Sequence, residues 1–180
     1  LRWTADMDMD QPPPVMGQRL HRRLREIIGM EDPYRTAKDA QNRLALDLLP
    51  GLEAKIRSAP DPLDLAVRLA IAGNVIDMGV AGNVTESGVR ESVRQAMREP
   101  VAGDLDAFRK AVAGARTILY LADNAGEIVF DRVLIEQLPA GRVTLAVRGA
   151  PVINDATRVD AQAAGLDRIV EVIDNGSDAP

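Results

Sequence analysis

The sequence contains no cysteine and only one histidine, His21, among its 180 residues. Without cysteine there is no disulfide, no thiolate metal ligand and no cysteine nucleophile. A single histidine also argues against an imidazole zinc site and against a Ser-His-Asp triad. We expect His21 to lie on a surface helix, far from the candidate site, and we interpret the arginines around it as a solvated helix face.

Basic residues are in the minority, with 22 Lys and Arg against 27 Asp and Glu, which gives a net charge of −5. A chain without a basic patch is not expected to bind nucleic acid. No apolar run reaches membrane-spanning length and no signal peptide is visible, so we expect no membrane partner and a cytoplasmic protein. The chain starts at Leu1 and stops at Pro180, directly after a Gly-Ser-Asp turn, and we expect it to be truncated at both ends.

Helical patterns dominate the chain up to about residue 114. One apolar face starts at Val15 and stops at Gly29, a residue typical of helix ends. A second helix is predicted to begin at Asp32-Pro33, and Pro50-Gly51 should break it, with a short polar helix following to about residue 58. The apolar stripe of the second helix consists of Ala37, Ala40, Leu44 and Leu48.

The segment 63–80 is apolar almost all round, which predicts a helix buried inside the fold. It nevertheless carries Asn74 and Asp77. Buried polar groups need partners or a function, so this pair either ends the helix or lines a site, and the pattern alone favours neither. Two further helices are predicted before residue 114, the second one capped by Asp104.

Strand-like runs then appear at 118–121, 143–147 and 169–173, separated by helical patterns at 125–138 and about 157–164. This alternation predicts a parallel sheet. The expected fold class is therefore α/β, with a helical N-terminal portion (1–114) followed by a Rossmann-like parallel sheet with flanking helices (115–180).

Acidic and amide side chains follow each of the three strands. Asp123 and Asn124 follow the first, Asn154 and Asp155 the second, and the segment 174–178 the third. The carboxyl ends of parallel strands meet at one edge of a sheet, where ligands bind. Oxygen ligands without thiols or imidazoles suit hard cations such as Mg²⁺ or Mn²⁺. The backbone N–H groups of Ala125 and Gly126 open the next helix and could attract an anion.

Each of these residues also has a plain structural interpretation. An Asp after a strand often caps the next helix, and Glu127 and Asp131 could simply complement the dipole of the helix that they begin. Three strand ends that all finish in Asp or Asn are harder to explain as caps. The sequence has neither a G-x-G-x-x-G nor a G-x-x-x-x-G-K-[ST] motif, so dinucleotide and P-loop chemistry are not supported.

Four strings resemble a known family. They are AGNVIDMGV (72–80), LADNAGEIVFDRVLIEQL (121–138), VRGAPVINDATRVDA (147–161) and DNGSDAP (174–180). They are similar to the DUF89 family, also called damage-control phosphatases or ARMT1-like metal-binding domains, and in particular to its prokaryotic-type subfamily. The strings occur in the family's order, and DNAGE and PVINDAT are long and specific.

The resemblance implies a metal-dependent phosphatase that acts on sugar phosphates or damaged phosphometabolites. The metal ligands would be Asp123, Asn124 and Asp155, with Mg, Mn, Co or Ni as the cation and with Asp123 and Asp155 as the catalytic carboxylates. Asn74 and Asp77 match a polar pair that lines the family's substrate pocket. Asn154, next to Asp155, could bind substrate or metal-bound water, and Asp174 and Asp178 are weaker candidates. Two family features are missing, an initial cysteine-containing segment and a later Lys-Gly-Gln-Gly motif whose lysine contacts phosphate.

A role without catalysis is the main alternative. A domain that binds a metal or a phosphometabolite could keep the acidic strand ends without the phosphate-binding lysine. A Rossmann-like methyltransferase would also place an acidic residue at a strand end, but the Asp-Asn and Asn-Asp pairs fit it poorly.

Overall fold

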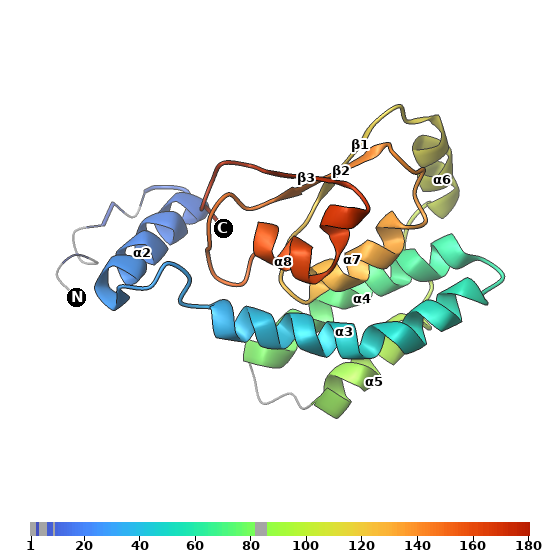
Figure 1. The fold of residues 1–180 in the computed structure, drawn as a ribbon, viewed down its shortest axis with the longest axis horizontal. Coiled ribbons are helices and arrows are strands. Elements are labelled where there is room, and N and C mark those ends of the chain that lie inside the picture. Colours follow the sequence, from blue (N-terminus) through green and yellow to red (C-terminus); the bar gives the residue numbers. More distant parts are fainter. Residues whose placement is uncertain (1–2, 4–6, 9, 82–85) are drawn as a thin grey trace.

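The computed structural model describes residues 3, 7–8, 10–81 and 86–180, and for residues 75–81, 86, 89 and 92 it describes the backbone alone. The described part contains seven helices and a three-stranded parallel sheet, which confirms the predicted α/β class (Figure 1). In chain order the elements are α2 (Pro13–Ile28), α3 (Arg35–Arg57), α4 (Pro62–Ala81), α5 (Glu86–Ala96), α6 (Leu105–Gly114), β1 (Ile118–Leu121), α7 (Glu127–Ile135), β2 (Val143–Val147), α8 (Arg158–Ala163), the 3-10 turn η1 (Leu166–Arg168) and β3 (Glu171–Asp174).

The sheet has the order β1-β2-β3, with both strand pairs parallel. Ile118 lies opposite Val143, and Leu145 lies opposite Val172. The predicted bounds of the first two strands are confirmed, and the third strand begins two residues later than expected. Because the strands are parallel, the segments that follow them emerge at one edge of the sheet.

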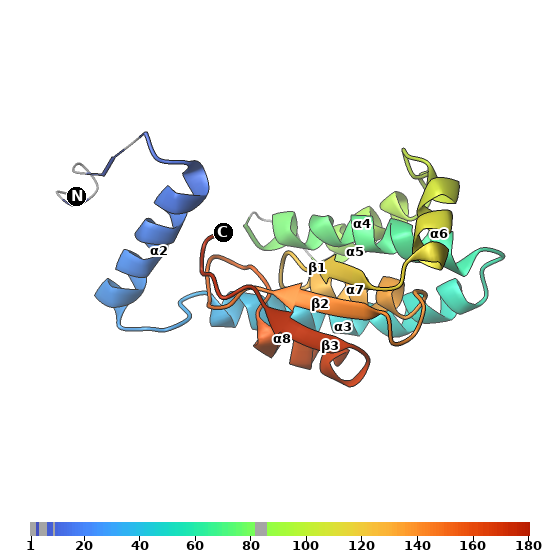
Figure 2. The same cartoon turned by 90° about the horizontal axis from the view of Figure 1, so that it is seen from above.

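Helices cover one face of this sheet. The side chains of β2 that point to this face, such as Leu145, join buried residues of α7, α3 and α4 in one hydrophobic cluster. The core therefore crosses the expected division at residue 114. The opposite face is open, since Leu119 and Leu121 of β1 are 61% and 70% exposed, and Figure 2 shows the helices gathered on the other side.

Two expectations about α3 are wrong. The helix begins at Arg35 because the carboxylate of Asp32 accepts a hydrogen bond from the N–H of Tyr34 (3.1 Å) and closes a turn there. The helix also continues through Pro50 to Arg57. Proline removes one helical hydrogen bond, but continuing the helix buries Ile56, which is 1% exposed, in the core.

The helix α2 ends at Gly29 in the left-handed conformation, as predicted. It stands apart from the other helices (Figure 2) and has no buried residue. The predicted burial of α4 is correct for one side only, since Leu69 is fully buried while Ile71 is 56% exposed. Within the described part, none of the helices combines the length and the apolarity needed to cross a membrane.

Candidate metal and substrate site

The loops after β1 and β2 lie against each other. The N–H of Ala125 donates to the carbonyl of Asn154 (2.8 Å), and the N–H of Ala156 donates to the carbonyl of Asp123 (2.7 Å). Asn124 and Asp155 form an isolated antiparallel bridge between these two bonds. The structure thus brings together the Asp-Asn and Asn-Asp pairs that the sequence separates by about thirty positions.

The two carboxylates of this arrangement differ in their surroundings. Asp123 is exposed, whereas Asp155 is 6% exposed and accepts a hydrogen bond from Nε of Arg148 (2.5 Å). Burial raises the pKa of Asp155 above its ordinary value, although Arg148 opposes the shift. A bound cation would be a second positive charge beside Asp155 and, like Arg148, would lower the pKa of this carboxylate.

The available donors fit a hard divalent cation. Asp123, Asn124 and Asp155 offer two carboxylates and one amide, all of them oxygen donors of the kind that Mg²⁺ and Mn²⁺ accept. Among the described residues, no group of three His, Cys, Asp or Glu side chains is arranged to hold a metal. A cation here would therefore need the amide of Asn124 or water to complete its shell.

Asn74 reaches this site through Glu127. Its Nδ2 donates to Oε1 of Glu127 (3.1 Å), and Nδ2 of Asn124 lies 3.5 Å from Oε2 of the same carboxylate. Helix α4 can approach α7 this closely because Gly73 has no side chain. A Cβ on Gly73 would lie 2.9 Å from Cγ of Glu127. The side chain of Asp77, the other residue of the predicted pair, lies outside the described residues.

A cavity of about 290 Å³ adjoins Asn74 and Glu127. Its wall also contains Asp131, whose carboxylate accepts a hydrogen bond from the hydroxyl of Tyr120 (2.6 Å). Burial, together with the charges of Glu127 and Asp123, raises the pKa of Asp131 to about 7. Asp131 thus has a hydroxyl partner and borders the cavity, in addition to its place near the start of α7.

The prediction of an anion site at the start of α7 is wrong. The N–H of Ala125 donates to Asn154, and the N–H of Gly126 donates to Oδ1 of Asn42 (2.7 Å). Both groups already have protein acceptors, so neither is available to a phosphate. The reasons are the close pairing of the two loops, which occupies Ala125, and the approach of α3, which occupies Gly126; no local pattern in the sequence indicates either contact.

The acidic residues that end and follow β3 form ion pairs with arginines of α8 and α2, outside the loops after β1 and β2. Asp174 accepts a hydrogen bond from Nε of Arg158 (2.8 Å). Asp178 is 6% exposed and binds α2 through Gln18, Arg22 and Arg25. The interpretation of the arginines as a solvated face is thus wrong for Arg25, whose side chain is 19% exposed, whereas Arg22 remains 55% exposed although it pairs with Asp178.

His21 also lies closer to the site than expected. Its Nδ1 is 3.2 Å from the hydroxyl of Tyr34, and the charge of Asp155 acts on it. Burial and the charge of Arg25 nevertheless lower the pKa of His21.

Sequence reasoning missed the buried polar residues of α3, two of which contact Asp160. Lys38, Gln41 and Asn42 are at most 3% exposed, while Ala40 of the predicted stripe is exposed. The predicted apolar stripe lies about one residue before the face that is buried in the structure. The prediction rested on the assumption that a buried helix face is apolar. Here the face meets Asp160 and the loop after β1, so polar groups are buried on it.

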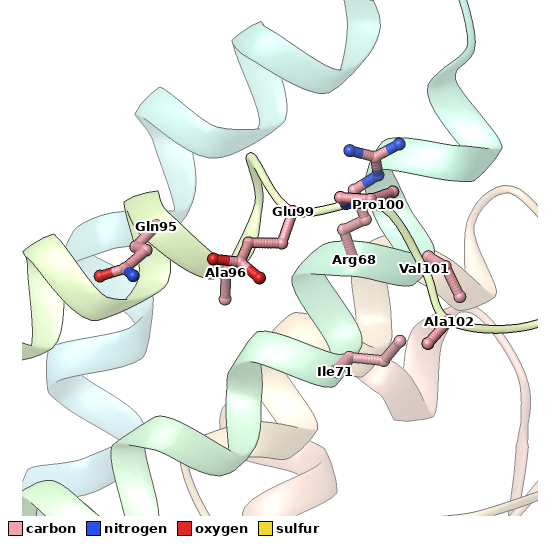
Figure 3. Close-up of a pocket in the computed structure, with 8 residues that line it drawn as sticks. All are labelled: Arg68, Ile71, Gln95, Ala96, Glu99, Pro100, Val101 and Ala102. Carbon is pink, nitrogen blue, oxygen red and sulfur yellow. The ribbon is translucent and has the colours of Figure 1, made fainter.

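A second cavity, of about 490 Å³, lies away from these residues. It is formed by α4, α5 and the segment after α5 (Figure 3). Its lining includes Arg68, Ile71 and Glu99, and none of the predicted site residues. The chemistry expected from the strand ends therefore does not take place there.

Comparisons with known proteins match this chain to one family along its whole length. A family model described as the damage-control phosphatase ARMT1-like domain matches residues 1–180. A damage-control phosphatase from Archaeoglobus fulgidus is 37% identical over 169 residues, covering 91% of this chain and 58% of the relative. Another from Pyrococcus horikoshii is 31% identical and covers 92% of this chain and 57% of the relative.

A solved structure shows the same fold. The crystal structure of a DUF89 family protein from Pyrococcus horikoshii superposes with a TM-score of 0.78 at 30% identity. The match covers 96% of this chain and 60% of the other. This chain therefore spans a little over half the length of the relatives that it matches.

Proposed function

Because the chain belongs to the ARMT1-like damage-control phosphatase family, we propose that it takes part in metal-dependent hydrolysis of small phosphorylated metabolites. Sugar phosphates and damaged phosphometabolites are the proposed substrates, and two relatives are named damage-control phosphatases. The observation that carries the proposal is the pairing of the loops after β1 and β2, which sets Asp123 and Asn124 beside Asp155.

In this proposal Asp123, Asn124 and Asp155 hold the cation, which would be Mg, Mn, Co or Ni. A bound cation would neutralise charge on the phosphate oxygens and orient the attacking group. We propose that water is the nucleophile, because a carboxylate nucleophile would have to keep one oxygen free while it also binds the metal. Arg148, 2.5 Å from Asp155, holds that carboxylate toward the site.

Asn74 and Asn154 are the proposed substrate contacts, together with Asp77. Asn74 lines the 290 Å³ cavity and is joined to the ligand loop by Glu127. Asn154 lies in the second loop, next to Asp155. An amide can donate to a phosphate or sugar oxygen without adding negative charge, which suits a substrate that is itself an anion.

The test is a phosphatase screen of this chain with a panel of sugar phosphates. Each reaction contains Mg²⁺, Mn²⁺, Co²⁺ or Ni²⁺, or a chelator, and each is repeated with Asp123→Ala. The matched control is Asp174→Ala, which removes the same kind of side chain from the end of β3, the far strand of the sheet, where it contacts Arg158. We expect hydrolysis that needs the cation, that is lost in Asp123→Ala and that persists in Asp174→Ala.

Hydrolysis indifferent to both chelator and Asp123→Ala would refute the proposed mechanism. If the chain binds the cation through Asp123 without any turnover, the alternative role as a metal-binding or phosphometabolite-binding domain is favoured instead. Calorimetric titration with Mn²⁺ separates these outcomes, because it measures binding without requiring a substrate.

A further inference from the structure

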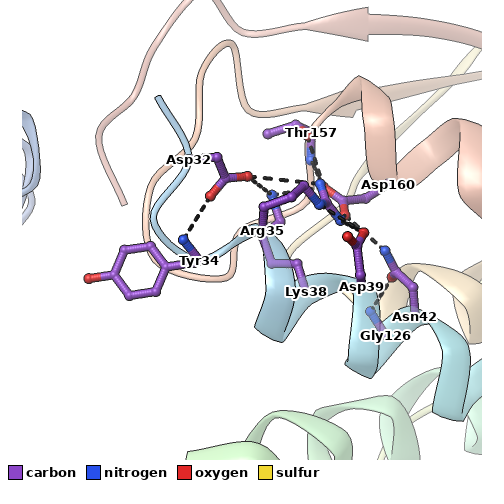
Figure 4. A network of polar contacts seen from close by, with 9 residues as sticks. All are labelled: Asp32, Tyr34, Arg35, Lys38, Asp39, Asn42, Gly126, Thr157 and Asp160. Atoms are coloured by element: carbon purple, nitrogen blue, oxygen red, sulfur yellow. Dashed lines mark hydrogen bonds and ion pairs between the residues drawn. The ribbon is translucent and has the colours of Figure 1, made fainter. Parts of the chain in front are cut away.

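We propose that Asn42 of α3 is a positioning residue for the metal site, because its one amide group ties together the two loops that carry the proposed ligands. This inference rests on the proposed function. Its Oδ1 accepts a hydrogen bond from the N–H of Gly126 in the first loop (2.7 Å), and its Nδ2 donates to Oδ1 of Asp160 (2.9 Å), next to the second loop. Figure 4 shows this amide between Gly126 and Asp160.

The first contact holds the loop of Asp123 and Asn124. Gly126 has a φ of 80° and is the N-cap of α7, which has no side-chain cap of its own. Its N–H is buried at a helix start and would otherwise lack an acceptor. Since α3 supplies that acceptor, the orientation of the peptide two residues after Asn124 depends on Asn42.

The second contact holds the loop of Asn154 and Asp155. Oδ2 of Asp160 accepts hydrogen bonds from the N–H of Thr157 (2.9 Å) and from its hydroxyl (2.8 Å). Thr157 follows Asp155 by two residues and is the N-cap of α8. Asp160 therefore fixes the outer end of the second loop and is itself fixed by Asn42.

A neutral amide suits this position better than any charged group. Asp160 already contacts two positively charged side chains, Arg35 (2.7 Å) and Lys38 (2.8 Å); Asp160 and Lys38 are fully buried, and Arg35 is 26% exposed. An Asp at position 42 would oppose Asp160, and a Lys could not accept from Gly126. Asn42 is 3% exposed, so water cannot easily replace it. Only a group with both a donor and an acceptor satisfies both partners.

Replacement of Asn42 should lower the affinity for the metal more than it lowers the stability of the fold. Residues that orient metal ligands typically change metal affinity about 10- to 100-fold when they are replaced. We expect Asn42→Ala to weaken Mn²⁺ binding by about that factor. Thr157→Val, which keeps the backbone bond and removes only the hydroxyl, should weaken it in the same direction by a smaller factor.

The control is Leu49→Ala on the same helix. Leu49 is 5% exposed and belongs to the core, so its truncation destabilises the protein without touching either loop. Mn²⁺ affinity is measured by titration calorimetry for each variant at a temperature where all of them are folded. Amide hydrogen exchange of the metal-free proteins gives a second readout, and Asn42→Ala should speed exchange at residues 125–126 and 156–157 together, whereas Leu49→Ala should not single out these amides.

The inference is overturned if Asn42→Ala binds Mn²⁺ as tightly as the parent chain. It is also overturned if Leu49→Ala weakens binding as much, because affinity would then follow stability alone. A parent chain that binds none of Mg²⁺, Mn²⁺, Co²⁺ and Ni²⁺ would refute the proposed function itself, and this inference with it; if it binds one of the others but not Mn²⁺, the same comparison of variants is made with that cation. The three outcomes are distinct.

Discussion

Replacement of Asp160 by asparagine should be among the most damaging single changes in this protein. The side chain is fully buried, and each of its oxygens accepts from more than one donor. Asp160→Asn keeps the shape but turns one oxygen into a donor that faces other donors. It also leaves Lys38, which is 0% exposed, with Asp32 at 3.6 Å as its remaining acidic partner.

The magnitude follows from the electrostatics of the pair. Burial alone would raise the pKa of Asp160, but the hydrogen bond from Arg35 and the charge of Lys38 lower it from 3.8 to about 2. At about 1.4 kcal/mol per pKa unit, the ionised form gains about 2 kcal/mol. Removing one partner of a buried pair costs more, about 3–5 kcal/mol, because the other charge stays buried.

The sign of the pH dependence follows from the direction of the shift. A folded-state pKa below the ordinary value means that the stabilisation is complete above pH 3.8 and is lost as the pH falls through about 2. The asparagine variant should lack this dependence.

Urea unfolding followed by circular dichroism can measure these effects as a double-mutant cycle. Lys38→Met should cost about 1 kcal/mol, because Asp160 keeps its bonds from Arg35, Asn42 and Thr157. The double variant should be about 2 kcal/mol more stable than the sum of the single changes predicts, because it no longer contains the buried Lys38 charge that Asp160→Asn leaves without its partner. The control Asp39→Asn, on an exposed ion pair with Arg35, should stay within about 0.5 kcal/mol of the parent.

Additive costs, or an Asp160→Asn variant as stable as the Asp39→Asn control, would refute this reasoning.

Three further predictions concern the surroundings of the site. The pKa of Asp131 is raised from 3.8 to about 7, so its contribution to stability is complete below pH 3.8 and is lost as the pH rises through about 7. Asp131→Asn should therefore reduce the fall in melting temperature across this pH range in a thermal-unfolding series. An unchanged pH profile would contradict the raised pKa of Asp131. Asp178→Ala should free α2, seen as faster tryptic cleavage within residues 13–28, whereas an unchanged cleavage rate would mean that other contacts hold the helix. Gly73→Ala should cost about 1–3 kcal/mol through its clash with Glu127, while Gly51→Ala, with open space around it, should stabilise α3 by about 0.4–1 kcal/mol, and equal effects would be inconsistent with the packing.

The sheet and its polar edge could be predicted because their signals are local. Short runs of apolar, strand-forming residues marked β1 and β2 to the residue, and a parallel sheet must bring its strand ends together. The approach of Asp123 and Asn124 to Asp155 follows from that topology alone. Their roles as ligands stay predictions, since they depend on the family resemblance and on the chemistry of the donors.

The contacts of α3 could not be predicted because they are not local. Asn42 lies 84 residues before Gly126 and 118 before Asp160. Its helix carries enough alanine and leucine to suggest an apolar stripe, and the period of that stripe is satisfied by more than one face. Buried Lys38 and Asn42 look like surface residues in the sequence, and only their partners at the far end of the chain explain their burial.

The same contacts bear on how the two portions of the chain depend on each other. We propose that the division at residue 114 marks a change in the order of elements and not two independent units. Residues 115–180 alone would leave the N–H of Gly126 without its acceptor and Asp160 without Lys38. They would also expose Val129 and Leu134 of α7, which pack in one cluster with Ala45 and Leu69. Helix α3, from the first part of the chain, neutralises the buried charge of Asp160 and accepts the hydrogen bond of Gly126. The sheet portion therefore needs α3 to keep the ligand loops together.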